Sequence, residues 1–170
     1  MSVAYYSQYC SPLGIIYIAA SDKGICKIVL PGQSEQELVI WLQKNFSKFV
    51  QKETDIIKQT ASELAEYFNQ QRTDFTIPLH LIGTAFQKKV WKELMKIPYG
   101  STVSYGYIAS KIGNPKACRA VGGANNKNPI PIVIPCHRIV GSTGKLVGYG
   151  GGLDLKEKLL KIENIKDFKK

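Results

Sequence analysis

The first half of the chain alternates between short apolar runs and amphipathic stretches. Apolar and β-branched residues fill positions 15–18 and 25–30, and a polar segment separates them, which predicts a β-hairpin. Apolar residues recur at helical spacing over 34–46 and 55–70, which predicts two helices. Residues 74–79 are expected to be extended. Together these elements predict a small N-terminal α/β domain over residues 1–80, built from a hairpin-containing sheet and helices.

The second half, residues 81–170, is predicted to be a mostly helical domain, so the fold class is α+β. Thr84 and Gln87 form a capping-box pattern at the start of a helix whose apolar face continues to Ile97. Two short helices follow, joined by a tight turn that contains glycine, and we expect a winged-helix-like helix-turn-helix. The expected ranges are 104–112 for the first helix and 115–124, capped by Asn114, for the second.

A buried segment links the helix-turn-helix to the last helix. Residues 130–134 are an apolar run that we expect to be buried and extended, and Pro135 ends it. The tripeptide Cys-His-Arg at 136–138 follows directly, so its thiol is placed at the end of a rigid segment. A glycine-rich loop over 141–152 and an amphipathic helix over 153–162 complete the pattern.

The composition is that of a globular protein, with 44% apolar and 21% charged residues. No apolar segment approaches the roughly 18 residues that a membrane-spanning helix needs. The first residues lack the basic and apolar regions of a secretory signal. We therefore expect a cytoplasmic protein that does not associate with membranes.

Charge is distributed unevenly between the two halves. Lys and Arg number seven against eight Asp and Glu in residues 1–80, but sixteen against five in residues 81–170, which accounts for the net charge of +10. Such an asymmetry indicates that the second half meets a polyanion, and nucleic acid is the usual candidate. A lysine-rich solvated surface would give the same count, so charge alone does not decide between the two.

The four cysteines are too sparse for a disulfide framework and form no C-x-x-C pair, so we expect free thiols. Cys10, Cys26 and His80 have the donor types of a structural zinc site, but their spacing is not diagnostic. We favour two buried structural thiols and a surface histidine. Neither a metal nor another cofactor is expected.

Cys136 is the candidate nucleophile. An ordinary cysteine is little ionised at neutral pH, so a reactive one needs a neighbouring base or a positive field, and His137 and Arg138 are adjacent to it. Because adjacent side chains generally point apart, His137 would act on the sulfur through a water molecule. A buried cysteine with two incidental neighbours fits the same three residues.

The segment Ile-Pro-Cys-His-Arg-Ile-Val at residues 134–140 resembles the active-site signature of the O6-alkylguanine-DNA alkyltransferases. The resemblance is dense from about residue 86 to 163 and thinner before it, where 11–14 is the main matching element. The other matching segments are 105–109, 113–117, 119–124, 128–129 and 151–153. It implies a variable N-terminal α/β domain, a mostly helical C-terminal domain and DNA repair. An alkyl group would pass from guanine O6, with thymine O4 as a candidate second substrate, to the protein.

The resemblance also implies roles for individual residues. Cys136 would accept one alkyl group irreversibly, His137 would take up the thiol proton through a water, and Glu163 would orient the histidine. Tyr105 would donate to guanine N3, and Asn128 would tie the helix-turn-helix to the active-site segment. The residues implied to bind the guanine are Pro131, Ile139, Tyr149 and Gly150, with the backbone carbonyls of Cys136 and Ile139 accepting from its exocyclic amine.

On DNA, Arg119 in the second helix of the pair would fill the space left by a flipped-out guanine, with this helix in the minor groove. The residues implied to contact DNA are Thr102, Lys116, Cys118, Arg119 and Lys127. Gly150 stands where many relatives have serine, so only its backbone amide can contact O6, and Cys118 stands where alanine is common. The expected partner is double-stranded DNA containing O6-alkylguanine, bound by a monomer.

Three other interpretations have less support. A Cys-His hydrolase would turn over and has no need of a basic helix-turn-helix. A protein that binds damage without transfer would lack Cys136. A transcription regulator requires sequence-specific binding, which minor-groove contact disfavours because its edges discriminate poorly among sequences.

Overall fold

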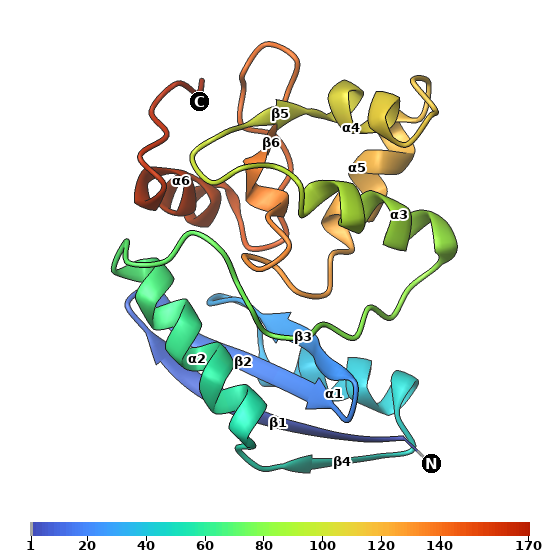
Figure 1. Ribbon diagram of the computed structural model, residues 1–170, viewed down its shortest axis with the longest axis vertical. Helices are drawn as coiled ribbons and strands as arrows, with labels where there is room; N and C mark the ends of the chain where they lie inside the picture. The colour runs from blue at the N-terminus through green and yellow to red at the C-terminus, as the bar shows by residue number, and fades with distance from the viewer. Residues whose placement is uncertain (1) are drawn as a thin grey trace. The chain divides into compact units, whose positions relative to one another are not determined.

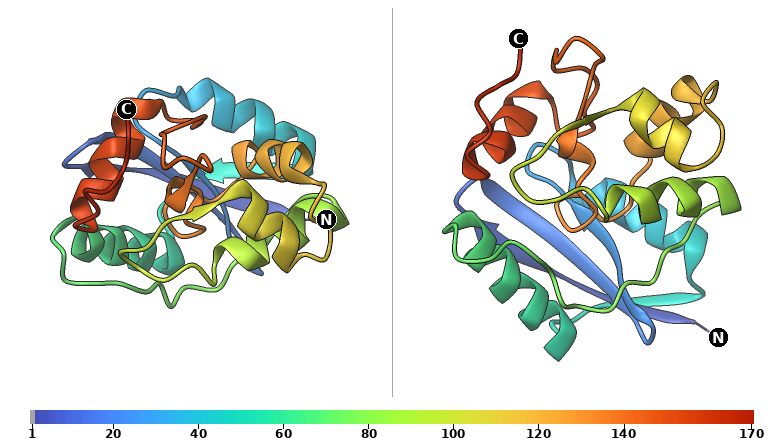
Figure 2. Two further views of the ribbon diagram at one scale, coloured as in Figure 1. Left: turned by 90° about the horizontal axis from the view of Figure 1, so that it is seen from above. Right: turned by 45° about the horizontal axis from the view of Figure 1, so that its top comes forward.

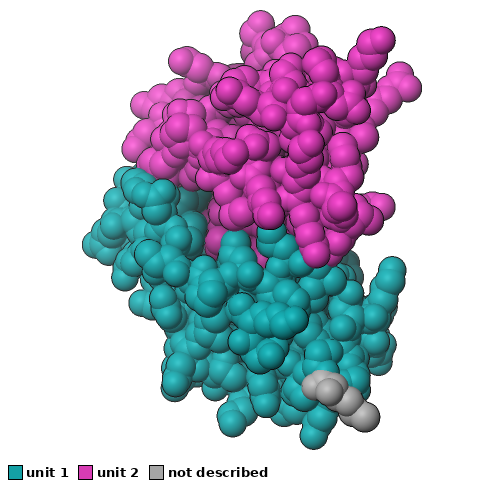
Figure 3. All heavy atoms as spheres, turned by 45° about the vertical axis from the view of Figure 1, so that its right-hand side comes forward, with its two compact units in different colours: residues 1–82 teal, residues 83–170 magenta. Residues whose placement is uncertain are grey.

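The computed structural model describes residues 2–170 of the chain. The chain forms two compact units, residues 1–82 and residues 83–170, which Figure 3 colours teal and magenta. The first unit combines a sheet with helices and the second is mostly helical, so the α+β fold class is confirmed. The division falls between Ile82 and Gly83. None of the helices among the described residues is long and apolar enough to cross a membrane.

A four-stranded sheet in the order β3-β2-β1-β4 forms the centre of the first unit (Figure 1). β1 (Val3–Ser11), β2 (Gly14–Ser21) and β3 (Gly24–Val29) pair antiparallel, and β4 (Lys48–Gln51) lies parallel to β1. The hairpin predicted from the two apolar runs is confirmed as β2 and β3. β1 and β4 were not predicted, because seven of the nine side chains of β1 and all four of β4 are half-buried or exposed, so neither strand shows the pattern of a buried apolar run.

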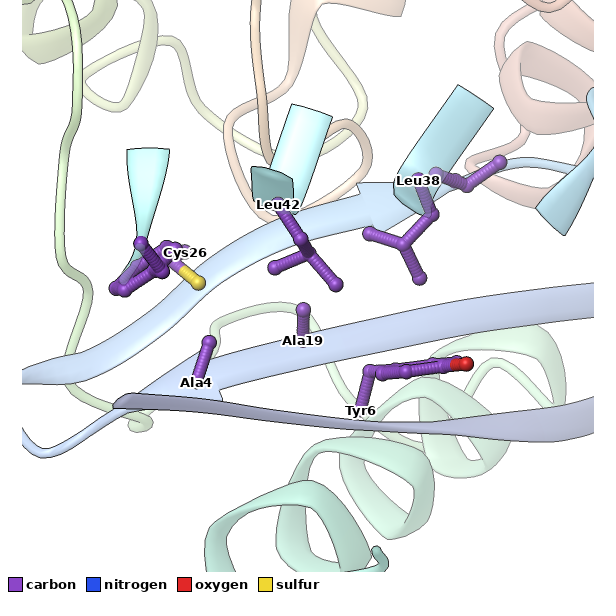
Figure 4. Packing of buried hydrophobic residues seen from close by; sticks show 8 residues of the cluster. Ala4, Tyr6, Ala19, Cys26, Leu38 and Leu42 are labelled. Atoms are coloured by element: carbon purple, nitrogen blue, oxygen red, sulfur yellow. The ribbon is translucent and has the colours of Figure 1, made fainter. Parts of the chain in front are cut away.

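α1 (Glu35–Asn45) and α2 (Asp55–Phe68) cover opposite faces of this sheet (Figure 2). Both predicted helices are confirmed. Leu38 and Leu42 of α1 are fully buried and point toward the sheet, Leu38 over Tyr6 and Leu42 over Ala19, as Figure 4 shows. The cluster of buried residues between α1 and the sheet consists of Ala4, Tyr6, Ala19, Cys26, Val29, Leu38, Leu42 and Phe46.

The segment 74–79, which was predicted to be extended, forms an isolated bridge to the sheet and no regular strand. The amide of Ile25 donates to the carbonyl of Pro78 at 2.9 Å, and the amide of His80 donates to the carbonyl of Ile25 at 2.8 Å. Pro78 has no N–H group, so the pairing cannot extend along the segment. Gly24 permits the close approach, since a Cβ atom there would lie 2.4 Å from the Pro78 oxygen.

The second unit begins with α3 (Ala85–Leu94), and its predicted capping box is confirmed. The Thr84 hydroxyl accepts from the Gln87 amide, and the Gln87 side chain accepts from the Thr84 amide. The buried indole of Trp91 donates from Nε1 to the carbonyl of Ala124 at 2.9 Å, which ties α3 to the helix-turn-helix. This bond gives the helix pair a rigid support.

The helix-turn-helix consists of α4 (Tyr105–Lys111) and α5 (Cys118–Asn126), and Gly113 takes a positive φ of 81° in the turn between them. α5 begins later than predicted. The Asn114 carbonyl accepts from the Ala117 amide and closes a turn, so the N-cap of α5 is Ala117, without a side-chain hydrogen bond, and not Asn114.

The winged-helix detail of the prediction is not confirmed. β5 (Val103–Ser104) and β6 (Ile139–Val140) pair in parallel, whereas the wing of that fold is an antiparallel hairpin. β6 directly follows the short 3₁₀ helix η1 (Cys136–Arg138), and α6 (Leu153–Ile162) comes after the glycine-rich loop. The last predicted helix is therefore confirmed.

The apolar run at 130–134 is buried as predicted, but it is not extended. It forms a turn in which the Ile134 amide donates to the Ile130 carbonyl at 2.9 Å and Ile132 takes a φ of 74°. Pro129, Pro131 and Pro135 surround the turn. Because proline lacks an N–H group, the segment cannot form the hydrogen-bond ladder of a strand.

Candidate active site

Asn128 holds the turn that precedes Cys136. It follows α5 and is buried, and its Nδ2 donates to the carbonyl of Ile134 at 2.8 Å while its Oδ1 accepts from the amide of Ile130 at 2.9 Å. One amide side chain thus satisfies two backbone groups that the prolines leave without partners in a ladder. This is the link between the helix-turn-helix and the cysteine segment that the family resemblance implies for Asn128.

Cys136 is the first residue of η1 and is 4% exposed. Burial raises the pKa of its thiol, because a thiolate is costly in an apolar interior. Hydrogen bonds from Asn128 and Tyr149 and the positive charge of Lys156 act in the opposite direction and stabilise the thiolate. The thiol is therefore held in its neutral form, with donors already in place for the charge that forms when it reacts.

His137 and Glu163 form a fully buried pair. Nε2 of His137 lies 2.7 Å from Oε1 of Glu163, and both side chains are 0% exposed. Burial lowers the pKa of His137, although the carboxylate beside it works against this shift. The histidine is neutral at physiological pH and can therefore act as a base. The carboxylate hydrogen-bonded to its ring would stabilise the positive charge that forms when the histidine takes up a proton.

Arg138 clamps the same carboxylate. Its Nε donates to Oε2 of Glu163 at 2.9 Å and its Nη2 donates to Oε1 at 2.9 Å, while Nη1 donates to the carbonyl of Ile97 at 2.7 Å. The amide of Gly100 adds a bond to Oε2 at 3.2 Å. Burial alone would raise the pKa of Glu163, but the hydrogen bonds from His137 and Arg138 and the positive charge of Arg138 outweigh it and lower the pKa to about 2.

Lys156 is a buried cation next to the thiol. Its side chain is 0% exposed, and Nζ donates to the carbonyl of Ile139 at 2.5 Å and to that of Val147 at 3.0 Å. Burial lowers its pKa to about 8, and the neighbouring Cys136 works against this shift. The ammonium is thus charged at neutral pH and contributes positive potential at the sulfur.

Tyr105 stands at the start of α4, with its ring against the backbone of Gly122 on α5. Its hydroxyl donates to the carbonyl of Val147 at 3.4 Å. Burial raises its pKa, and proximity to Cys136 raises it further, so the phenol keeps its proton and remains a donor. The structure brings the phenol and the thiol together, as the resemblance implies.

The residues implied to bind guanine differ in exposure. Ile139 and Pro131 are buried, Tyr149 is half-buried and its side chain hydrogen-bonds to the thiol, and Gly150 is exposed. The Ile139 carbonyl already accepts from Lys156, which fixes its direction. Gly150 lies near the backbone of Asn126, so the glycine-rich loop borders the end of α5.

Four of the five residues implied to contact DNA lie on α5 or next to it in sequence, and the fifth, Thr102, directly precedes β5. Arg119 is the second residue of that helix and is exposed, and Cys118 before it is exposed as well. Lys116 and Lys127 flank the helix and are also exposed, whereas Thr102 is half-buried. Four of the five side chains are therefore accessible to a polyanion.

The first unit offers no assembled metal centre. Among residues 2–170, no three His, Cys, Asp or Glu side chains are grouped as ligands. Cys26 is buried as predicted, which raises its pKa to about 12. The prediction that Cys10 is buried is wrong, because its side chain is exposed on strand β1. His80 is half-buried, and its Nδ1 lies 2.7 Å from the hydroxyl of Ser21.

Two functional side chains were missed by sequence reasoning. Arg138 was noted only as a neighbour of Cys136, because its partner Glu163 is 25 residues away in sequence. Lys156 received no role, although a signal was present. It interrupts the apolar stripe of α6 formed by Leu155, Leu159 and Leu160, and a lysine on a buried helix face requires partners.

The second unit therefore combines a helix-turn-helix with a buried thiol that is provided with donors, a histidine base and an orienting carboxylate. These features define a protein that carries out nucleophilic cysteine chemistry next to a nucleic-acid-binding helix pair.

Comparison with known proteins identifies the family. Residues 4–81 match the ribonuclease-like domain of 6-O-methylguanine DNA methyltransferase, and residues 85–165 match its DNA-binding domain. The chain belongs to this family.

Relatives cover nearly the whole chain. A methylated-DNA–protein-cysteine methyltransferase of Methanosarcina acetivorans is 44% identical over 161 residues, which are 94% of this chain and 97% of the relative. The constitutive methylated-DNA–protein-cysteine methyltransferase of Bacillus subtilis is 41% identical over 162 residues, 95% of this chain and 96% of the relative. A crystal structure of Mycobacterium tuberculosis OGT in complex with DNA has a TM-score of 0.80 and 39% identity, covering 94% of this chain and 92% of that one.

Proposed function

We propose that Cys136 is the acceptor through which this methyltransferase repairs DNA. Alkyl transfer from DNA to a cysteine is the activity for which the relatives are named. Of the four cysteines, Cys136 alone is buried beside a histidine, a carboxylate and a cation. The observation that carries the proposal is this set of partners around one thiol, in the unit that contains the helix-turn-helix.

The reaction is a displacement at the carbon attached to guanine O6. His137 takes up the thiol proton through a water, and the sulfur forms a bond to that carbon while the bond from carbon to O6 breaks with its electron pair. Tyr105 donates to N3 of the departing guanine, which would otherwise leave as an anion. Glu163, held by Arg138, stabilises the charge on His137. The products are guanine in DNA and an S-alkyl cysteine.

The product limits each molecule to one reaction. A thioether has no carbonyl group for water to attack, so hydrolysis cannot regenerate the thiol. The protein is consumed in proportion to the damage that it repairs. This applies to methyl groups, to larger alkyl groups and to O4-alkylthymine alike.

Access to O6 requires that the base leave the stack, at a cost of about a few kcal/mol. Arg119 occupies the space left in the duplex, from the exposed N-terminal turn of α5 in the minor groove. Lys116 and Lys127 contact phosphates, and Thr102 and Cys118 pack against the backbone. In the pocket, the carbonyls of Cys136 and Ile139 accept from the guanine amine, between Pro131 and Tyr149, with the amide of Gly150 facing O6.

One copy of the chain is sufficient for this reaction. The thiol, its hydrogen-bonding partners and the helix-turn-helix all lie in a single unit, residues 83–170. The protein therefore acts on double-stranded DNA as a monomer. It works in the cytoplasm, or in the nucleoid or nucleus when bound to DNA.

Intact mass spectrometry tests the proposal. The protein is incubated with duplex DNA that carries one O6-methylguanine, and Cys136→Ser serves as the matched variant. We expect the wild-type protein to gain the mass of one methylene on the peptide that contains Cys136, and Cys136→Ser to gain nothing. Complete repair by a small fraction of an equivalent of protein would contradict the single-use mechanism, and modification of another cysteine would contradict the assignment.

A further inference from the structure

The ammonium of Lys156 joins two backbone segments on either side of the active centre. One bond goes to the carbonyl of Ile139, just after η1, and the other to the carbonyl of Val147 in the glycine-rich loop. The side chain is fully buried, so water does not compete for these carbonyls. Charge-assisted hydrogen bonds of this kind are roughly twice as strong as neutral ones.

The Val147 carbonyl is also the acceptor for the Tyr105 hydroxyl, at 3.4 Å. A carbonyl oxygen has two lone pairs and can accept from both donors. Buried Leu146 anchors the loop on one side of Val147, whereas Gly148 on the other side is exposed and takes a positive φ of 46°. The direction of this carbonyl, and with it the resting position of the phenol, therefore depends on Lys156.

We propose that Lys156 is a positioning residue for Tyr105, because it fixes the carbonyl on which the phenol rests until guanine N3 takes its place. The inference rests on the donor role of Tyr105 proposed above. No covalent bond changes in this step, since Tyr105 exchanges one hydrogen-bond acceptor for another. Lys156 also stabilises the Cys136 thiolate, so a test has to separate its effect on the phenol from its effect on the sulfur.

A double-mutant cycle makes this separation. Single-turnover methyl transfer from duplex O6-methylguanine is measured for the wild type, Lys156→Met, Tyr105→Phe and the double variant. We expect each single change to slow transfer by about tenfold, since a misplaced group loses most of its effect. If Lys156 acts through Tyr105, Lys156→Met slows transfer less in the Tyr105→Phe background than in the wild type, and by no more than it slows the reaction of the thiol with iodoacetamide. Losses that multiply in the double variant would overturn the proposal.

Reaction with iodoacetamide gives a second readout, because it depends on the thiol and not on the phenol. We expect Lys156→Met to lose more in methyl transfer than in iodoacetamide reactivity, and equal losses would show that Lys156 acts on the sulfur alone. Lys161→Met, an exposed lysine on the same helix, is the matched control and keeps both wild-type rates. If Lys156→Met does not fold, Lys156→Gln replaces it in the same cycle.

The outcome also separates this inference from the proposed function. If Tyr105→Phe transfers methyl groups at the wild-type rate, the donor role of Tyr105 fails, and so does the inference about Lys156. Alkyl transfer to Cys136 would stand in that case, because the mass gain does not depend on the phenol.

Discussion

Replacement of Glu163 by glutamine should remove a large, pH-dependent share of the stability of the second unit. The substitution keeps the size of the side chain but takes away the charge that Arg138 and His137 surround. A pKa lowered from 4.5 to about 2 corresponds to about 3 kcal/mol of stabilisation at neutral pH. Loss of one partner of a buried ion pair costs roughly 3–5 kcal/mol, which agrees with this figure.

The sign of the pH dependence follows from the direction of the shift. The folded pKa lies below that of the unfolded chain, so the stabilisation is fully present above about pH 4.5 and is lost as the pH falls toward 2. The wild type and Glu163→Gln should therefore differ by about 3 kcal/mol at pH 7 and converge below pH 4. His137 is buried in its neutral form, so its protonation at low pH destabilises both the wild type and Glu163→Gln.

Urea unfolding at several pH values, followed by tryptophan fluorescence, measures this difference. Trp91 is buried in the second unit, and a Trp41→Phe background removes the signal of the first unit. Glu157→Gln is the control, because that carboxylate pairs with exposed Lys161 at the surface and its loss should change the stability much less than the loss of the Glu163 carboxylate does. A difference below about 1 kcal/mol at pH 7, or one that persists unchanged to pH 3, would refute the reasoning.

Three further predictions concern DNA binding and the turn before Cys136. Arg119→Ala should slow repair of duplex DNA by about tenfold or more while sparing the reaction with free O6-methylguanine base, and equal losses on both would exclude the role of filling the duplex. Asn128→Leu should cost about 2 kcal/mol in urea unfolding, because it leaves the Ile130 amide unpaired and removes one of the two donors to the Ile134 carbonyl; a cost within measurement error would contradict this. Affinity for undamaged duplex should fall steeply with salt concentration. The slope of log affinity against log salt concentration should be smaller by about one in Lys116→Ala, and a salt-independent affinity would contradict phosphate binding.

The periodic parts of the fold could be predicted from the sequence, and the irregular parts could not. The helices and the β2–β3 hairpin follow from apolar spacing, which is local information. β4 is an edge strand whose pairing with β1 is set by contacts distant in sequence. The turn at 130–134 was not predicted, because apolar composition indicates burial but not the direction of the backbone. The signal in the sequence is the set of three prolines, Pro129, Pro131 and Pro135, which prevents a strand.

The candidate site shows the same division. The motif around Cys136 locates the nucleophile, and the resemblance supplied its partners. Sequence alone does not indicate that Arg138 turns toward Glu163 or that Lys156 reaches two carbonyls, because these contacts join η1 and its neighbours to α6 across 25 and 17 residues. A charged residue within an apolar stripe is the one local sign that such contacts exist.

The separation between His137 and Glu163 also bears on synthesis of the protein. Glu163 follows His137 by 26 residues in the sequence, and the glycine-rich loop comes between them along the chain. While a ribosome is still making α6, the growing chain already contains the thiol but lacks the carboxylate and the lysine. The capacity to accept an alkyl group from DNA should therefore arise late, once the downstream helix has docked and has brought the carboxylate and the lysine to the site.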